Sequence, residues 1–189
     1  TLNFTDGGIL QNSFNPSNAP ILLFLFVFGI GKAALMPLHW WLPAAMVAPT
    51  PVSALLHAVA VVKAGVFSIL MVICYIFGPE FMNSSGSGTF LIWASTITLF
   101  LSSVIAITKN DIKARLAYST VSQLSYIILG GAIATNYSLI ASVSNIMMHG
   151  VGKITLFFCA GAIYVSTKIT KISDLNGLGH KMPLTFFAF

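Results

Sequence analysis

Three lysines lie inside long apolar stretches of this sequence: Lys32, Lys63 and Lys153. No Asp or Glu lies in any of those stretches, so none of these lysines has a carboxylate partner within its own stretch. An ammonium near the middle of a bilayer costs about 2.5–3.5 kcal/mol on insertion scales, and such residues usually line a water-filled path or face a partner. The lysines therefore predict a protein that moves protons or other ions.

Polar residues recur on one face of the stretch that contains Lys153. Asn145, His149 and Lys153 follow one another at intervals of four residues. On a helix each is displaced by only about 40° from the last, and the set climbs about 12 Å. An isolated His or Asn can simply bond a neighbouring helix. A lysine is not satisfied as cheaply, so the set favours a functional stripe over a packing seam.

His57 and Lys63 share another apolar stretch but not one face of it. They are six residues apart, which on a helix is about 9 Å along the axis and about 120° around it. We therefore expect each to have its own neighbour or water chain, because they cannot form one stacked pair. Histidine titrates near neutrality and a buried lysine can act as a base, so both can pass protons on.

Lys32 follows Gly29-Ile30-Gly31. Two glycines around one residue can permit a local break in a membrane helix, and transporters build ion sites at such breaks. The alternative is that Lys32 extends toward the interface near Trp40 and Trp41, since it lies only two turns from the end of its stretch. The residues alone leave both interpretations open.

The composition places these stretches in a membrane. Hydrophobic residues make up 57% of the chain and charged residues 7%, and the mean hydropathy is +0.91, which excludes an ordinary soluble domain. We expect an all-α polytopic membrane protein, since about 20 residues cross about 30 Å of hydrocarbon. Five full spans are predicted at 20–38, 53–77, 89–108, 116–134 and 138–166, with a sixth beginning near Pro183.

The ends of the chain and its two cysteines say less about the function than the lysines do. Residues 1–19 are predicted to be a polar segment outside the membrane, and residues 20–189 part of the membrane domain. Because the chain lacks an initiator Met and stops in an opening apolar helix, we expect an internal part of a longer protein. Cys74 and Cys159 fall within predicted spans and have no metal-ligand spacing.

Basic residues are unevenly distributed among the loops. Six of the nine Lys and Arg residues lie between spans, in two loops: Lys109, Lys113 and Arg115, then Lys168, Lys171 and Lys181. Five alternating crossings put both loops on one side, whereas the other side has Asp6 and Glu80 and no basic residue. The positive-inside rule then predicts cytoplasmic basic loops and an outer N-terminal tail. We expect the membrane to be a bacterial inner membrane. A third loop on the basic side, 38–52, is rich in Trp and Pro, and its prolines predict no regular helix there.

Four runs of the sequence carry a resemblance to a known family. They are GKAALMPLHWWLPAAM at 31–46, APTPVSALLH at 48–57, KAGVF at 63–67 and DIKARLAYSTVSQ at 111–123. Together with His149 and Lys153, they closely resemble the antiporter-like membrane subunits of respiratory complex I and the large subunits of Mrp-type cation/proton antiporters. The resemblance covers nearly all of residues 20–185.

The resemblance implies a fourteen-helix subunit with two inverted five-helix repeats, of which this chain supplies about helices seven to twelve. Lys32 matches the lysine of the family's broken seventh helix, which pairs with a glutamate outside this chain. His57 and Lys63 match eighth-helix positions, and His149 and Lys153 match the eleventh-helix relay. Asn145 departs from the pattern, because several members have a histidine there, so only an orienting role is expected for it.

The resemblance also implies a function in proton translocation through this Lys/His relay. Its expected partners are other membrane subunits and the lipid bilayer. The expected transported ions are protons, with sodium as a second candidate. Residues 45–49 and Lys63 look more like Mrp-related and hydrogenase-related branches than like the main complex I chains. No cofactor or metal site is expected in this chain, so any redox activity would belong to partner subunits. The alternative is a membrane scaffold whose polar residues serve helix packing only. Three lysines in three spans argue against it, because packing does not need a permanent cation.

Overall fold

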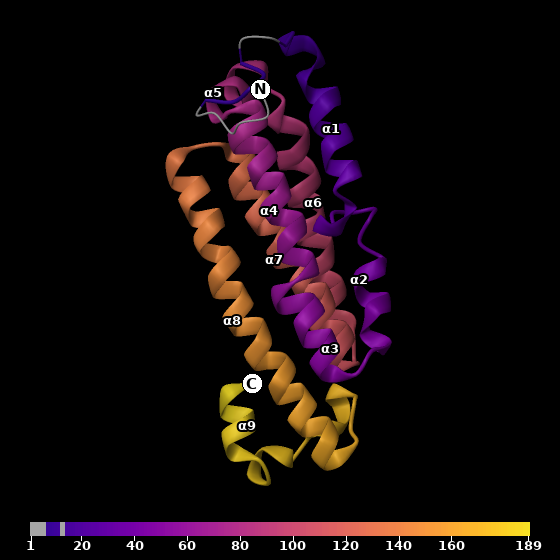
Figure 1. Cartoon of the computed structure of the whole chain (residues 1–189). Coiled ribbons are helices and arrows are strands. Elements are labelled where there is room, and N and C mark those ends of the chain that lie inside the picture. Colours follow the sequence, from indigo (N-terminus) through magenta and orange to yellow (C-terminus); the bar gives the residue numbers. More distant parts are fainter. Residues whose placement is uncertain (1–6, 12–13) are drawn as a thin grey trace.

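The computed structural model describes residues 7–11 and 14–189, and within them the chain is helical without a named strand (Figure 1). Its α-helices are α1 (Ala19–Gly29), α2 (Trp41–Ala44), α3 (Thr50–Ala54), α4 (Val61–Met71), α5 (Pro79–Ser85), α6 (Gly88–Thr108), α7 (Ile112–Ile133), α8 (Asn136–Thr167) and α9 (Pro183–Ala188). The all-α prediction is confirmed. Part of the predicted 1–19 segment, residues 1–6 and 12–13 with Asp6, lies outside the described residues.

Four helical runs among the described residues are long and apolar enough to cross a membrane: Thr50–Phe77, Gly88–Thr108, Ile112–Ile133 and Asn136–Thr167. They match four of the predicted spans to within about four residues. The first run joins α3 and α4 through a π-helical turn at Leu55–Val59 and ends in another at Val72–Phe77. As predicted, a further helix begins at Pro183.

The first predicted span, 20–38, is not one continuous helix, and that part of the prediction is wrong. Helix α1 stops at Gly29, a 3-10 turn follows at Gly31–Ala33, and Ala34 adopts a left-handed φ of 56°. The break expected at Gly29-Ile30-Gly31 is therefore present. Below it the chain continues through irregular turns to α2 (Figure 1).

The loop 38–52 also differs from its prediction. It holds the four-residue helix α2 and a 3-10 turn at Ala45–Val47, and α3 begins at Thr50. Pro51 is accommodated in the first turn of α3, where its missing N–H needs no partner. Trp40 is exposed, as suits an interfacial position.

The two predicted basic loops lie together at one end of the bundle, which we call the basic end (Figure 1). The Ile112 N–H donates to the Thr170 carbonyl at 3.0 Å, and the Ile172 N–H donates to the Asn110 carbonyl at 2.8 Å. Helix α5, which carries Glu80, lies at the opposite end. The structure thus confirms that both basic loops share one side.

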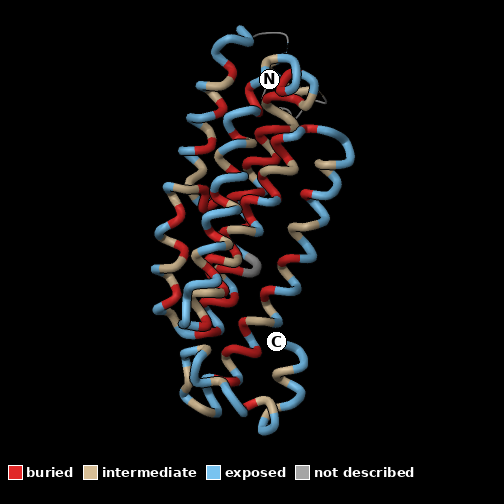
Figure 2. Tube along the Cα trace, turned by 180° about the vertical axis from the view of Figure 1, so that it is seen from behind, coloured by how far each residue is buried: buried red, intermediate tan, exposed pale blue. Residues whose placement is uncertain are grey.

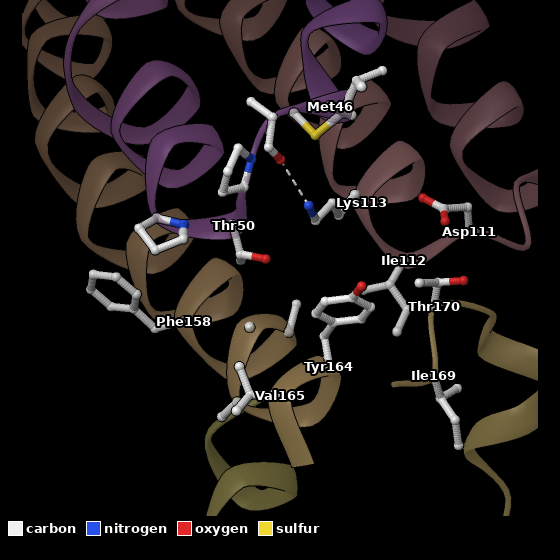
Figure 3. A pocket seen from close by; sticks show the side chains of 17 residues that line it. Met46, Thr50, Asp111, Ile112, Lys113, Phe158, Tyr164, Val165, Ile169 and Thr170 are labelled. Carbon is white, nitrogen blue, oxygen red and sulfur yellow. Dashed lines mark hydrogen bonds between the residues drawn. The ribbon is translucent and has the colours of Figure 1, made fainter. Parts of the chain in front are cut away.

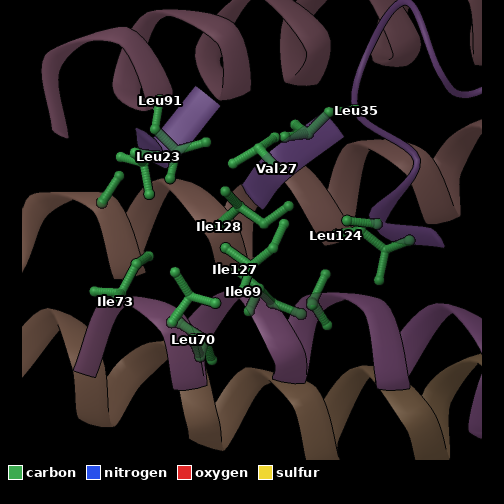
Figure 4. Packing of buried hydrophobic residues seen from close by; sticks show 14 of the residues in the cluster. Leu23, Val27, Leu35, Ile69, Leu70, Ile73, Leu91, Leu124, Ile127 and Ile128 are labelled. Carbon is green, nitrogen blue, oxygen red and sulfur yellow. The ribbon is translucent and has the colours of Figure 1, made fainter. Parts of the chain in front are cut away.

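The main apolar core lies between α1, α4, α6 and α7. Figure 4 shows side chains of all four helices meeting: Leu23 and Val27, Ile69 and Leu70, Leu91, and Leu124, Ile127 and Ile128. Helix α7 is the most buried of the long helices, whereas α6 and α8 each leave one face exposed (Figure 2). Those faces carry large apolar side chains, which suit lipid or neighbouring helices.

Candidate functional site

The polar face of α8 meets α4 through one short contact. Lys63 Nζ lies 2.6 Å from His149 Nδ1, although the two residues are 86 positions apart. Lys63 is 8% exposed and His149 is 9% exposed. An ammonium has donors only, so a charged Lys63 donates to Nδ1, and the imidazole proton then resides on Nε2. The pair can hold a proton on either residue.

Lys153 lies one turn farther along α8 and contacts α7. Its Nζ donates to the Leu116 carbonyl at 3.1 Å and to the Ser119 hydroxyl at 2.9 Å, and only 4% of the residue is exposed. It is also within electrostatic range of Lys63. Two buried lysines therefore lie at the same polar face of α8, one from α4 in contact with His149 and the other one turn farther along.

His57 completes the cluster from the π-helical turn of the α3–α4 run. The turn is wide, because the Ala60 N–H bonds the Leu55 carbonyl five residues back, and such turns frequently mark functional sites. The His57 ring is fully buried, with its centroid 5.7 Å from that of Phe157 on α8, and it is within electrostatic range of Lys153. As expected, His57 and Lys63 have separate neighbours.

Three ring nitrogens of this cluster are buried without a hydrogen-bond partner in the described part of the chain: both nitrogens of His57 and Nε2 of His149. Buried polar atoms are normally satisfied. These nitrogens can therefore bond a water molecule or another polar group.

Lys32 is not part of this cluster. It is exposed on the 3-10 turn that follows α1, next to a pocket of about 500 Å³ that Trp41 also lines. The turn packs closely on α4, because a Cβ at Gly65 would lie 2.6 Å from the Ala33 nitrogen. The predicted pairing of Lys32 with an acid outside this chain stays a prediction.

Asn145 lies one turn above His149 on α8 and is half-buried. Its side chain makes no hydrogen bond to any residue that the structure describes. The orienting role predicted for it also stays a prediction.

Ser119 is a partner that sequence reasoning undervalued. The Ser and Thr residues of α7 suggest helix packing, and Thr120 and Ser125 do bond carbonyls of their own helix. Ser119 instead accepts a hydrogen bond from Lys153 across the helix interface. Nothing in the local sequence distinguishes Ser119 from Thr120, because only the packing of α7 on α8 decides which hydroxyl meets the ammonium.

The described residues contain no group of three or more His, Cys, Asp or Glu side chains that could hold a metal ion. The cluster itself brings together exchangeable protons on two lysines and two histidines.

Comparisons with known proteins match the whole chain. Residues 1–189 match the model of the NADH:quinone oxidoreductase/Mrp antiporter transmembrane family. The chain is 41% identical over 167 residues to NADH-ubiquinone oxidoreductase chain 5 of Arabidopsis thaliana, covering 88% of this chain and 24% of that protein. It is 36% identical over 179 residues to a component of a probable K(+)/H(+) antiporter of Rhizobium meliloti, covering 95% of this chain and 17% of that protein.

Solved structures agree with the sequence matches. The Mrp complex from Dietzia sp. superposes with a TM-score of 0.79 at 33% identity, covering 92% of this chain and 19% of that one. A membrane-bound sulfane sulfur reductase, an archaeal respiratory membrane complex, gives a TM-score of 0.82 at 29% identity, covering 95% of this chain and 37% of that one. The chain spans about a quarter of the length of the Arabidopsis relative. The match over the full chain, the shared fold and the apolar helices together show that it is an integral, multi-pass membrane protein and belongs to the NADH:quinone oxidoreductase/Mrp antiporter family.

Proposed function

We propose that this chain is a proton-translocating part of a larger membrane protein, and that Lys63, His149, Lys153 and His57 form its relay. The observation that carries the proposal is the 2.6 Å contact between Lys63 and His149 in the interior of the bundle. Neither lysine of the cluster is paired with a carboxylate in the described part of the chain. Cations without counter-ions are expensive at membrane depth and are characteristic of proton and ion paths.

The arrangement couples the two lysines electrostatically. Like charges at short range repel strongly where water is excluded, so a proton on Lys153 disfavours a second one on Lys63, and the reverse. His149 bonds Lys63 directly and lies one helical turn from Lys153. It is therefore placed to take the proton that one lysine loses before the other gains it. A packing seam would need only neutral hydrogen-bonding groups.

The relatives support a role in a larger assembly. They include a chain of an NADH-ubiquinone oxidoreductase and a component of a probable K(+)/H(+) antiporter, and the solved neighbours are membrane complexes. We infer that the full-length protein works with other membrane subunits, and that protons, with a monovalent cation in an antiporter setting, are what it moves. The basic end faces the cytoplasm in this proposal, as the positive-inside rule requires.

The test is proton flux through the full-length protein in its native assembly. Lys63→Met and Lys153→Met each remove one exchangeable cation and keep an apolar side chain of similar length. We expect both to abolish proton-coupled transport in membrane vesicles at matched protein level while membrane insertion is retained, because removing a buried cation eases insertion. Lys181→Met, at an exposed loop position, is the matched control and should transport normally. Near-normal flux in both relay variants would reduce these lysines to structural residues and refute the proposal.

A further inference from the structure

A pocket of about 720 Å³ opens at the basic end between the 38–52 loop, the start of α7 and the last turns of α8 (Figure 3). At about 30 Å³ for each molecule, it is large enough for many waters. The relay described above does not include it.

Polar groups converge on this pocket although most of its wall is apolar. Thr50, Asp111, Lys113, Tyr164 and Thr170 line it, and Figure 3 shows their side chains around the same space. Lys113 Nζ donates to the Ala48 carbonyl at 3.0 Å, which holds one ammonium at the wall. Outside, Lys168 Nζ lies 5.3 Å from the centroid of the Tyr164 ring. A pocket with charged groups at the basic loops is suited to water.

An apolar cluster separates this pocket from the relay. We call it the basic-end cluster, and its members are Met46, Ala54, Ile112, Leu116, Ala117, Phe157 and Ala160. Three of them, Met46, Ile112 and Ala160, also line the pocket. Two others contact the relay: the Leu116 carbonyl accepts from Lys153, and the fully buried Phe157 ring packs against His57.

Each helix around the pocket carries, in the same order along its axis, a residue that lines the pocket, a residue of the basic-end cluster and a residue at the relay. On α8 this order runs from Gly161 through Phe157 to Lys153, at intervals of four residues. On the α3–α4 run it goes from Thr50 through Ala54 to His57, and on α7 from Ile112 through Leu116 to Ser119: these steps are three or four residues long. Each step is about 4.5–6 Å along the helix axis, so the cluster is an apolar layer about one helical turn thick.

We propose that the pocket is the aqueous route by which protons from the basic end approach His57 and Lys153, and that Phe157 is the hydrophobic barrier that separates water in the pocket from the relay. The inference rests on the proposed function and adds the side of access and the residue that limits it. Apolar constrictions of this kind control conduction by excluding water. Phe157 is fully buried and has the largest side chain of the layer, so it determines whether the layer stays dry.

The first arm measures water access without any transport. In the full-length assembly lacking Cys74 and Cys159, Ala160→Cys should react with a small hydrophilic thiol reagent added from the basic side, because Ala160 lines the pocket. Val151→Cys, at an exposed position of α8 that does not line the pocket, is the control and should not react. Ser119→Cys, beyond the layer, should react slowly. Adding Phe157→Ala should speed the Ser119→Cys reaction roughly tenfold or more as the layer becomes hydrated.

The second arm measures passive proton leak in proteoliposomes without substrate. Phe157→Ala should raise the leak, whereas Phe100→Ala, which removes the same ring from the exposed face of α6, should not. Ala54→Ser adds a hydroxyl to the layer without opening a void. It should raise the leak as well, and it carries the test if Phe157→Ala does not assemble.

The experiments distinguish a wrong aqueous route, a wrong barrier residue and a wrong relay from one another. If Ala160→Cys is unreactive from the basic side, lipid or another part of the protein fills the pocket and the aqueous route is refuted. If Phe157→Ala and Ala54→Ser leak no more than Phe100→Ala, and Ser119→Cys reacts at the same rate in both backgrounds, Phe157 is not the barrier. Neither result depends on the Lys63→Met and Lys153→Met fluxes, which test the relay alone.

Discussion

Gly65→Ala is predicted to destabilise the protein through the break in the first predicted span. Gly65 lies on α4 where the 3-10 turn with Lys32 packs against that helix. An added Cβ would lie 2.6 Å from both the Ala33 nitrogen and the Lys32 carbonyl carbon, and 2.8 Å from the Lys32 oxygen. These are backbone atoms, so no side-chain rotation can relieve the contact.

The magnitude follows from these distances. Carbon atoms in ordinary contact lie about 3.5–4.0 Å apart, so the turn must move by about 1 Å. Forcing an extra methyl group into a packed site typically costs about 1–3 kcal/mol. Replacing Gly by Ala within a helix returns about 0.5–1 kcal/mol. We therefore expect a net loss of stability of up to about 2.5 kcal/mol, with a displaced Lys32 and reduced proton flux.

Gly152→Ala is the matched control, because a Cβ at this α8 position meets nothing within 4 Å. It should be neutral or slightly stabilising. The assay compares thermal unfolding of the two variants in the full-length assembly, followed by Trp fluorescence, and proton flux at matched protein level. If Gly65→Ala is as stable as Gly152→Ala and transports normally, the close packing of the broken segment on α4 is refuted.

Two further predictions concern topology and the polar stripe. In a background lacking Cys74 and Cys159, Lys171→Cys should be labelled only from the cytoplasmic side and Ser84→Cys only from outside, because these exposed positions lie at opposite ends of the bundle. Labelling of both from one face of the membrane would overturn the predicted orientation. Asn145→Ala should lose only part of the proton flux, since an amide cannot exchange protons near neutral pH, and Asn145→His should be tolerated; complete loss in the alanine variant would give Asn145 more than an orienting role.

Several features could be predicted from the sequence because they depend on local properties. Hydropathy and length identify four spans directly, since a membrane helix must satisfy its backbone within one continuous segment. The pair Gly29 and Gly31 permits the break that the structure shows, because a helix is easier to interrupt at residues without a Cβ. The distribution of Lys and Arg predicts that the loops at 109–115 and 168–181 share one end.

Contacts between distant segments required the tertiary structure. Periodicity places His149 and Lys153 on one face of α8 but cannot say that Lys63 meets the first and Ser119 the second. The same limit applies to Phe157. In the sequence it is one more apolar residue of a membrane helix, and only the packing of three helices shows that it lies between a pocket and a buried histidine. The physical reason is that a residue's own helix fixes its direction, whereas its partner depends on how side chains of separate helices fill the space between them.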